Sequence, residues 1–494
     1  MGDIEKILEK NGPARASVVA RALQEECGLS AVAARKRISR ISKPLFRFPV
    51  RLLPKSESFL YTGDQRKTER FWTNLHATLR ETNSVYGVAL DGLMARGGVV
   101  VTDEFPVISG APLALKGQVS SERVARALEE AQAIKRETWI ELGAVYACDR
   151  PEIGHADFGG LRSRMRVEAI MLDGLRKWAA NLGLASFNKI AIRGENHSRQ
   201  VGQFKWDLTG PSYLLPLRRG GSLNGFLVAD VFCHDNLDLH SIQFFIRKVK
   251  MLRESSNSGD ALAVLVARRF TSQALKAGHA AGLVLATPEN LFGWKVGRAI
   301  ESLVETLNNA AATAVANPVK LADLIDDLSE IEGAAGNLRG ILFELIAAHL
   351  ARIGSSSIDM GVAARDENGN VADIDVLKVC GKSECVGIEC KGKRPGGVVA
   401  AEEVQDWLKR IPIFRSHLVK ESRFREAKIS FEFWTTGTFS PDALILLQKE
   451  KQARTKTPID WKDGATVEDL AKTSKEKRLV DSLREHFLRH PLAQ

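Results

Sequence analysis

The chain has 494 residues, of which 44% are hydrophobic and 26% charged, and its formal net charge is +10 at pH 7. This length predicts several domains, and this composition is typical of globular proteins and excludes a disordered chain. The N-terminus shows no signal peptide and no apolar run approaches the roughly 20 residues that span a bilayer, so we expect a cytoplasmic protein without membrane contact.

The first 60 residues carry 12 Lys and Arg against 6 Asp and Glu. Three amphipathic runs, "DIEKILEK", "ASVVARALQEE" and "AVAARKRISRI", precede an alternating stretch, and Ser30 is a plausible cap for the third. This order predicts a winged helix-turn-helix over residues 1–65. Its recognition helix would present four basic residues to DNA phosphates or base edges: Arg35, Lys36, Arg37 and Arg40. Winged helices also dock proteins, but the local charge excess favours DNA.

Residues 66–145 predict a second winged-helix-like or helical domain. Two helical runs are followed by the strand-like "VVVTDEFPVIS" and by a further helix over "SSERVARALEEAQAIKRE". This domain is less basic than the first. Packing or contact with a protein partner is therefore as good an interpretation as DNA binding.

From residue 146 the pattern changes to alternating helices and strands. We expect one α/β domain over 146–295, an Ala-rich helical linker over 296–330, and a second α/β domain over 331–494 with the same order of elements. The phrase "RFTSQAL" in the first α/β domain matches "TFSPDAL" in the second at a constant offset of 169 residues. A tandem duplication explains this match economically.

Two adjoining strands of the last domain carry charge among apolar residues. In "VADIDVLKV" Asp373 and Asp375 point to one face, and in "VGIECKGK" Glu389 and Lys391 share a face. Burying a charged side chain costs several kcal/mol of folding free energy unless the charge is paired or binds a metal. Two converging carboxylates suit Mg2+ or Mn2+, and a neighbouring lysine can hold a scissile phosphate. The alternative is a surface hairpin with an ordinary Glu-Lys pair.

The order of a helix with Glu344, a strand with Asp375 and a strand with Glu389 and Lys391 resembles the PD-(D/E)XK nuclease superfamily, the restriction-endonuclease-like fold, and is most similar to its Mrr-like branch. The resemblance covers about 336–465. It implies that Asp375 and Glu389 hold the metal, that Lys391 is the catalytic lysine and that Glu344 lies near the metal. It also implies, more weakly, a supporting role for Gln405. Because Asp373 lies on the same face as Asp375, the choice of main ligand stays open.

The resemblance extends to the earlier copy, where Glu168, Asp207 and Asp230 stand at the corresponding positions. Phe232 takes the place of the lysine, so we expect a degenerate domain retained for packing, dimerisation or DNA binding. The predicted fold class is therefore a multidomain α+β and α/β protein. N-terminal winged helices precede two tandem restriction-endonuclease-like domains, the first degenerate.

These expectations converge on a metal-dependent DNA endonuclease of a prokaryotic restriction or antiviral defence type. Lys393 and Arg394, just after Lys391, are expected to grip the DNA backbone. A homodimer or a defence-system partner is a further expectation. One alternative is a DNA-binding regulator or assembly protein whose nuclease-like domains are structural, and another is an effector nuclease for RNA or DNA that a partner activates.

Overall fold

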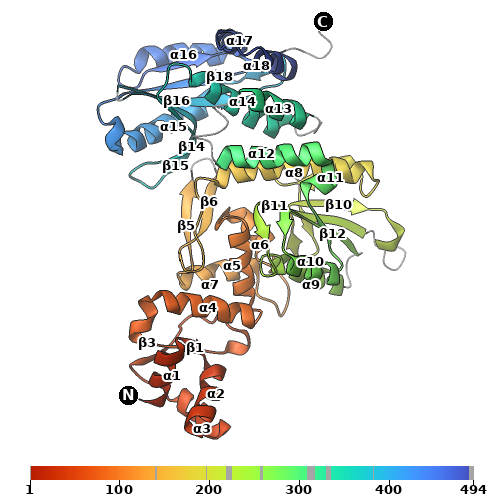
Figure 1. The fold of residues 1–494 in the computed structure, drawn as a ribbon, viewed down its shortest axis with the longest axis vertical. Coiled ribbons are helices and arrows are strands. Elements are labelled where there is room, and N and C mark those ends of the chain that lie inside the picture. The colour runs from red at the N-terminus through yellow and green to blue at the C-terminus, as the bar shows by residue number, and fades with distance from the viewer. Residues whose placement is uncertain are drawn as a thin grey trace.

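The computed structural model forms an elongated molecule with the N-terminal helices at one end and the C-terminal sheet at the other (Figure 1). Within the described part of the chain, no helix is both long and apolar enough to cross a bilayer. The structure describes residues 2–139, 142–195, 197–217, 225–255, 260–308, 318–329, 335–381 and 383–488.

The N-terminal unit (residues 2–67) packs three helices against a small antiparallel sheet of order β1-β3-β2. Ser30 caps the third helix as predicted, since its side chain accepts a hydrogen bond from the N–H of Ala33. Gly28 ends the second helix in the left-handed region, at φ 65°. The elements are α1 (Asp3–Asn11), β1 (Ala14–Arg15), α2 (Ala16–Cys27), α3 (Ala31–Ser39), β2 (Leu45–Arg47) and β3 (Phe59–Thr62).

The second unit (residues 69–148) differs from its prediction. Only the first three residues of "VVVTDEFPVIS" form a strand and the rest is helical, and the predicted helix over 120–137 ends at Glu130. Gln132 has a φ of 61°, which a continuing helix does not allow. A hairpin follows, and the strand order β5-β6-β4 repeats that of the first unit. The elements are α4 (Glu69–Glu81), α5 (Val85–Ala95), β4 (Val99–Val101), α6 (Phe105–Ile108), α7 (Ser121–Glu130), β5 (Ile134–Trp139) and β6 (Gly143–Cys148).

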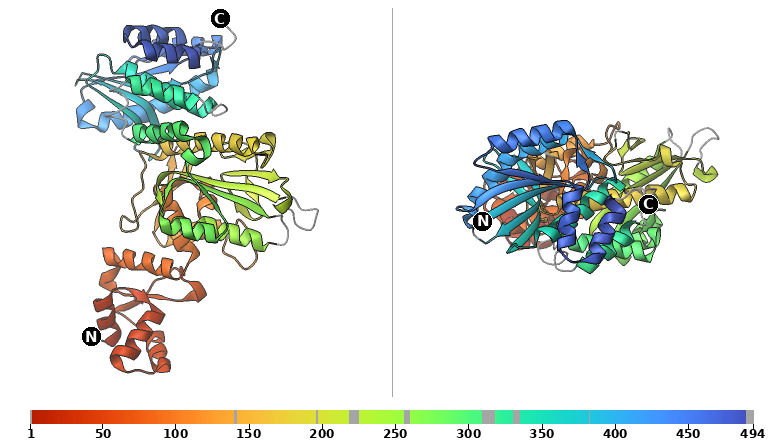
Figure 2. Two further views of the ribbon diagram at one scale, coloured as in Figure 1. Left: turned by 45° about the vertical axis from the view of Figure 1, so that its right-hand side comes forward. Right: turned by 90° about the horizontal axis from the view of Figure 1, so that it is seen from above.

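The middle unit (residues 161–292) is a five-stranded sheet of order β13-β12-β11-β10-β7. Helix α8 covers one face, and α9 and α10 cover the other (Figures 1 and 2). The elements are α8 (Leu161–Asn181), β7 (Ala191–Ile192), β8 (Gln200–Val201), β9 (Phe204–Lys205), β10 (Leu208–Ser212), β11 (Gly225–Leu237), α9 (Gln243–Glu254), β12 (Ala261–Phe270), α10 (Ser272–Ala280), β13 (Val284–Ala286) and α11 (Pro288–Phe292).

The C-terminal unit (residues 335–488) has its strands in the order β20-β18-β16-β15, with β14 paired to β15. Near the end of the described chain, α18 buries Leu479 and Leu483 completely. The elements are α14 (Ala335–Ala351), β14 (Ser357–Arg365), β15 (Val371–Cys380), β16 (Glu384–Lys391), β17 (Val398–Val399), α15 (Ala401–Lys420), β18 (Lys428–Thr435), β19 (Thr438–Phe439), α16 (Pro441–Ala453), β20 (Ile459–Lys462), α17 (Gly464–Thr473) and α18 (Lys477–Leu483).

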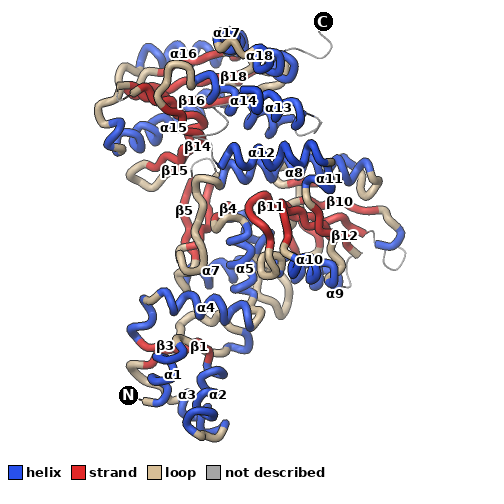
Figure 3. Tube along the Cα trace, in the orientation of Figure 1, coloured by secondary structure: helices blue, strands red, loops and turns tan. Residues whose placement is uncertain are grey.

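The strands of the two larger sheets, red in Figure 3, lie in the middle of the molecule and at its C-terminal end, and the two sheets have the same topology. In each, an antiparallel pair, β10–β11 or β15–β16, is extended by two parallel strands on one side and by one antiparallel strand on the other. The matching phrases found in the sequence also start equivalent helices. Thr271 caps α10 and Ser440 caps α16, each accepting a hydrogen bond of 3.2 Å from the third residue beyond it. The topology therefore supports the predicted duplication.

The units pack into one another along the chain. The stretch predicted as a linker contains α12 (Trp294–Asn308) and α13 (Pro318–Ser329), and these helices join one apolar core. Leu172 of α8, Leu303 of α12 and Ile346 of α14 are all buried in that core. The C-terminal sheet also continues into the second unit, because β15 pairs with β5 at Val371 and Trp139.

Candidate active site

Asp375 and Glu389 lie where the β15–β16 ladder ends. The last paired residues are Val376 and Ile388, so the two acids are the next residues on their strands and face each other. The backbone N–H of Cys390 donates to Oδ2 of Asp375 at 2.8 Å. Both acids are almost fully buried, at 1% and 2% exposure. The sequence correctly predicted that these two strands pair and that their charged positions coincide.

Lys391 completes the predicted set. Its Nζ donates to Oε1 of Glu389 at 2.6 Å. Burial lowers the pKa of Lys391, but the nearby charges of Glu389 and Asp375 raise it by more, so the side chain is an ammonium. Its side chain is 30% exposed, which makes it the part of the cluster that faces outward.

Two further acids stand beside this pair. Glu344 projects from α14, and burial together with the charge of Asp375 raises its pKa to about 6, against the opposing charge of Arg166. Asp373, two residues before Asp375, is 3% exposed, and burial raises its pKa to about 6 as well. The structure therefore gathers four carboxyl groups at one place, as the resemblance implied for three of them.

Three arginines neutralise this cluster, and none of them was predicted from the sequence. Nη1 of Arg162 lies 2.9 Å from Oδ1 of Asp375, and Arg166 is hydrogen-bonded to Glu344. Both come from α8 of the middle unit. Arg410 of α15 donates to Oε1 of Glu389 at 2.9 Å.

The carboxylates keep two oxygens that accept no hydrogen bond within the described chain, Oδ1 of Asp375 and Oε2 of Glu389, and both are buried. Oδ1 of Asp375 has the ion pair with Arg162, whereas an unpaired buried carboxylate oxygen such as Oε2 of Glu389 is costly, and a hard divalent cation is a partner that suits both oxygens. Within the described residues, no group of three or more His, Cys, Asp or Glu is arranged to hold a metal. Mg2+ commonly binds through one or two carboxylates, with waters and phosphate oxygens as its other ligands, so this pair fits it.

The remaining predicted residues lie around the cluster. Gln405 is exposed on α15, and the residue of this helix that contacts Glu389 is Arg410. Lys393 donates to both carboxylate oxygens of Glu403 at 2.8 Å, whereas Arg394 is exposed. Arg394 is therefore accessible from solvent, whereas Lys393 is tied to α15.

The middle unit repeats the acid pair. Its ladder ends at Leu208 and Ala229, so Asp207 and Asp230 hold the positions of Asp375 and Glu389. The N–H of Val231 donates to Oδ2 of Asp207 at 3.0 Å, as Cys390 does for Asp375. The helix acid, Glu168, accepts a hydrogen bond of 2.6 Å from Arg193.

The middle cluster is sealed by cations from other elements. Arg96 of the second unit is hydrogen-bonded to Asp207, and its guanidinium stacks 4.7 Å from the ring centre of Phe232. The ammonium absent from position 232 comes instead from α9, where Lys248 donates to Oδ2 of Asp230 at 2.6 Å. Asp207, Asp230 and Lys248 are all 0% exposed. A nucleic acid therefore cannot reach this cluster in the described conformation.

The predicted DNA-binding residues of the N-terminal unit, Arg35, Lys36, Arg37 and Arg40, are all exposed at α3. Arg37 forms an ion pair of 2.8 Å with Asp3. On the same helix Val32 is 76% exposed. The helix thus offers charge and one apolar side chain to solvent.

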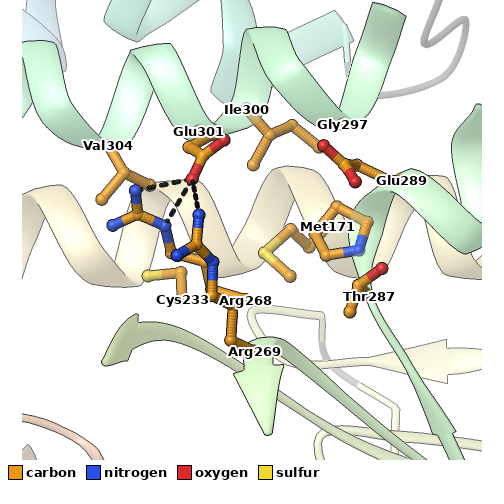
Figure 4. Close-up of a pocket in the computed structure, with 11 residues that line it drawn as sticks. Met171, Cys233, Arg268, Arg269, Thr287, Glu289, Gly297, Ile300, Glu301 and Val304 are labelled. Atoms are coloured by element: carbon orange, nitrogen blue, oxygen red, sulfur yellow. Dashed lines mark hydrogen bonds and ion pairs between the residues drawn. The ribbon is translucent and has the colours of Figure 1, made fainter. Parts of the chain in front are cut away.

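A cavity of about 170 Å³ lies between α8, the middle sheet and α12 (Figure 4). Two arginines line it, Arg268 and Arg269, and both contact Oε1 of Glu301. Because one carboxylate already holds both cations and no acid of either cluster lines the cavity, it is not the catalytic candidate.

No family model, no curated protein and no solved structure matches the chain. Function is therefore inferred from the chemistry of the site itself.

Proposed function

We propose that the protein is a metal-dependent nuclease that hydrolyses DNA phosphodiesters at Asp375, Glu389 and Lys391. The observation that carries the proposal is the pair of buried carboxylate oxygens, on Asp375 and Glu389, that accept no hydrogen bond at the end of a ladder, with an ammonium 2.6 Å from the second acid. Oδ1 of Asp375 is ion-paired with Arg162, but Oε2 of Glu389 accepts no hydrogen bond within the described chain, and a purely structural ion pair would not leave that oxygen unsatisfied. The C-terminal unit is accordingly proposed to be a PD-(D/E)XK nuclease domain.

Asp375 and Glu389 would hold Mg2+ or Mn2+, which supplies an activated water and neutralises charge at phosphorus. The backbone N–H of Cys390 fixes the carboxylate of Asp375, so this ligand does not need to reorganise. Lys391, the most exposed member of the cluster, binds a non-bridging oxygen of the scissile phosphate and stabilises the charge that develops there. Arg410 donates to the same oxygen of Glu389 as Lys391 does, Oε1, and so helps to orient this carboxylate.

The other units are proposed to bring DNA to this site. The N-terminal unit has three helices and a β1-β3-β2 sheet, an arrangement that suits a winged helix with α3 as its recognition helix. The second unit repeats the strand order and is proposed to be a second winged helix. The middle unit is proposed to be an inactive nuclease copy that serves as scaffold. A cytoplasmic restriction or defence enzyme fits this combination, and cutting both strands with one site per chain favours a dimer.

A cleavage assay tests the proposal. Plasmid, linear, methylated and single-stranded DNA, together with RNA, are incubated with the full chain and Mg2+ or Mn2+. We expect cleavage that Lys391→Ala reduces by about 10² to 10³, the usual cost of losing one group that stabilises the transition state. Lys428→Ala, an exposed lysine on the neighbouring strand, is the control and should cut like the wild type. Intact substrates under every condition would contradict the proposal.

One observation favours a second function, a DNA-binding regulator with structural nuclease-like units. Arginines occupy both acid clusters, at Asp375 through Arg162 and at Asp207 through Arg96. A regulator would bind DNA with the same affinity in the presence and absence of divalent metal and would cut nothing.

A further inference from the structure

The first turns of α8 lie on the C-terminal acid cluster. Besides its contact with Asp375, Nη1 of Arg162 is 3.8 Å from Oδ2 of Asp373. Glu344 and Glu389 are also close enough to act on the charge of Arg162. One guanidinium from another unit therefore lies among the four acids, at the oxygen that the metal needs.

Arg166 extends this contact by one helical turn. It lies four residues after Arg162, on the same face of α8, and is hydrogen-bonded to Glu344. A residue further along α8, Glu168, faces the middle unit instead, where it is ion-paired with Arg193 in the acid cluster of that unit. Helix α8 thus contacts both clusters, and its N-terminal turns contact the intact one.

A second element covers the same place. Trp139, at the end of β5, pairs with Val371, which lies two residues before Asp373 on β15. Trp139, Val371 and Leu161, the first residue of α8, are buried together in one apolar cluster. Outside this apolar cluster, Arg365 of β14 donates a hydrogen bond of 2.7 Å to Glu137 of β5.

The two covering elements are continuous in sequence. Strand β6 ends at Cys148 and α8 begins at Leu161, so only the loop 149–160 separates the hairpin from Arg162. We call the hairpin β5–β6 and the first turns of α8 the cap (residues 134–139, 142–148 and 161–166). Under the cap, none of the four acids is more than 5% exposed, so a phosphate group of DNA cannot reach them.

We propose that the cap is an autoinhibitory device, in which Arg162 occupies the metal position of the C-terminal site until the cap moves away. This inference rests on the proposed function, since it concerns the same site. A guanidinium and a divalent cation cannot both lie against Oδ1 of Asp375, because they compete for one oxygen and repel each other. The arginine also satisfies acids that would otherwise be buried without a counter-charge, which keeps the metal-free state folded.

Binding of Mn2+ alone tests the cap without relying on cleavage. Free Mn2+ is measured by electron paramagnetic resonance during titration of the full chain, as wild type and as Arg162→Gln. If Arg162 leaves the metal position in only about a tenth of the wild-type molecules, or in fewer, Arg162→Gln should bind Mn2+ at least about tenfold more tightly than the wild type. Adding Asp375→Asn to the variant should abolish the gain, which assigns it to this site.

The matched control is Arg176→Gln. Arg176 lies on the same helix and is also ion-paired, to Asp173 and Glu195, away from the acid cluster. Its loss should leave Mn2+ affinity unchanged. If Arg162→Gln alone fails to fold, Arg162→Gln with Asp373→Asn removes one charge of each sign, and the same gain is expected of this double variant.

The outcomes separate the cap from the nuclease. Tighter Mn2+ binding by Arg162→Gln with more cleavage supports both proposals, and tighter binding without cleavage of any nucleic acid supports the cap alone. Unchanged or weaker binding overturns the cap. So does a variant that loses the cleavage shown by the wild type, because Arg162 would then assist the reaction.

Discussion

Asp375 and Asp207 hold the same position in two sheets of one chain. Each is the residue just outside an antiparallel ladder, and each accepts on Oδ2 the N–H of the residue after the opposing acid, Cys390 or Val231. Their surroundings differ in access. Beside Asp375 the ammonium of Lys391 is 30% exposed, whereas beside Asp207 the side chains of Arg96 and Arg193 are only 2% and 9% exposed. This difference supports the proposal that the first site carries out chemistry and that the second stabilises the fold.

The buried pair of the middle unit predicts a stability effect. Lys248→Met leaves Asp230 buried and without its cation, and breaking a buried pair in this way costs about 3 to 5 kcal/mol. The double variant Lys248→Met with Asp230→Asn should cost less, because no unpaired charge remains. Urea denaturation measures both. Lys250→Met, exposed on the same helix, serves as the control and should change little.

If instead Lys248→Met and the double variant unfold at the same urea concentration, the ammonium of Lys248 is not a structural counter-charge. The assignment of the middle unit as a scaffold would then lose its main support.

The basic residues of α3 predict a salt effect. Each Lys or Arg that contacts a DNA phosphate contributes about 0.9 to the slope of log affinity against log salt. Replacing Arg35, Lys36 and Arg40 by Ala should therefore weaken DNA binding and make it less sensitive to salt. Fluorescence anisotropy at several NaCl concentrations measures both quantities. Lys116→Ala, exposed in the second unit, is the control. An unchanged slope would remove α3 from the DNA interface.

Acid should destabilise the second unit through Asp91. Burial raises the pKa of this carboxyl, but hydrogen bonds from His76 and Arg80 lower it by more, so the pKa lies below the ordinary value of 3.8. Because the pKa of Asp91 is lower in the folded state than in the unfolded state, its ionised carboxylate stabilises the fold at pH values above the unfolded-state pKa. This stabilisation is lost as the pH falls through the folded-state pKa. The free energy of unfolding of the wild type should therefore drop between about pH 5 and pH 3.

In Asp91→Asn this drop should be smaller, since the side chain no longer titrates. Urea unfolding curves at each pH measure the difference. An equally steep drop in the variant would show that other carboxyls carry the acid sensitivity.

The sequence predicted most elements and the central residues of the site for a local reason. Alternation within two short strands places Asp375 and Glu389 on one face, and the turn between the strands makes them meet. Arg162 and Arg166 could not be found this way, because Arg166 and its partner Glu344 are 178 residues apart and nothing local records the contact. Lys248 was missed because its ammonium comes from a helix and not from the strand position that Phe232 occupies.

The hairpin of the second unit was missed for a different reason. Helical spacing continues past Glu130 in the sequence, and only the left-handed backbone of Gln132 turns the chain into β5. A residue other than glycine gives no clear signal for such a turn.

The proposed metal site at Asp375 and Glu389 is tested most directly by the position of Mn2+ in a crystal of the Lys391→Ala variant bound to DNA, located by anomalous scattering. We expect a peak between Oδ1 of Asp375 and Oε2 of Glu389, next to a phosphate of the DNA. DNA bound at α3 with no manganese between these two oxygens, or with manganese held elsewhere, would contradict it.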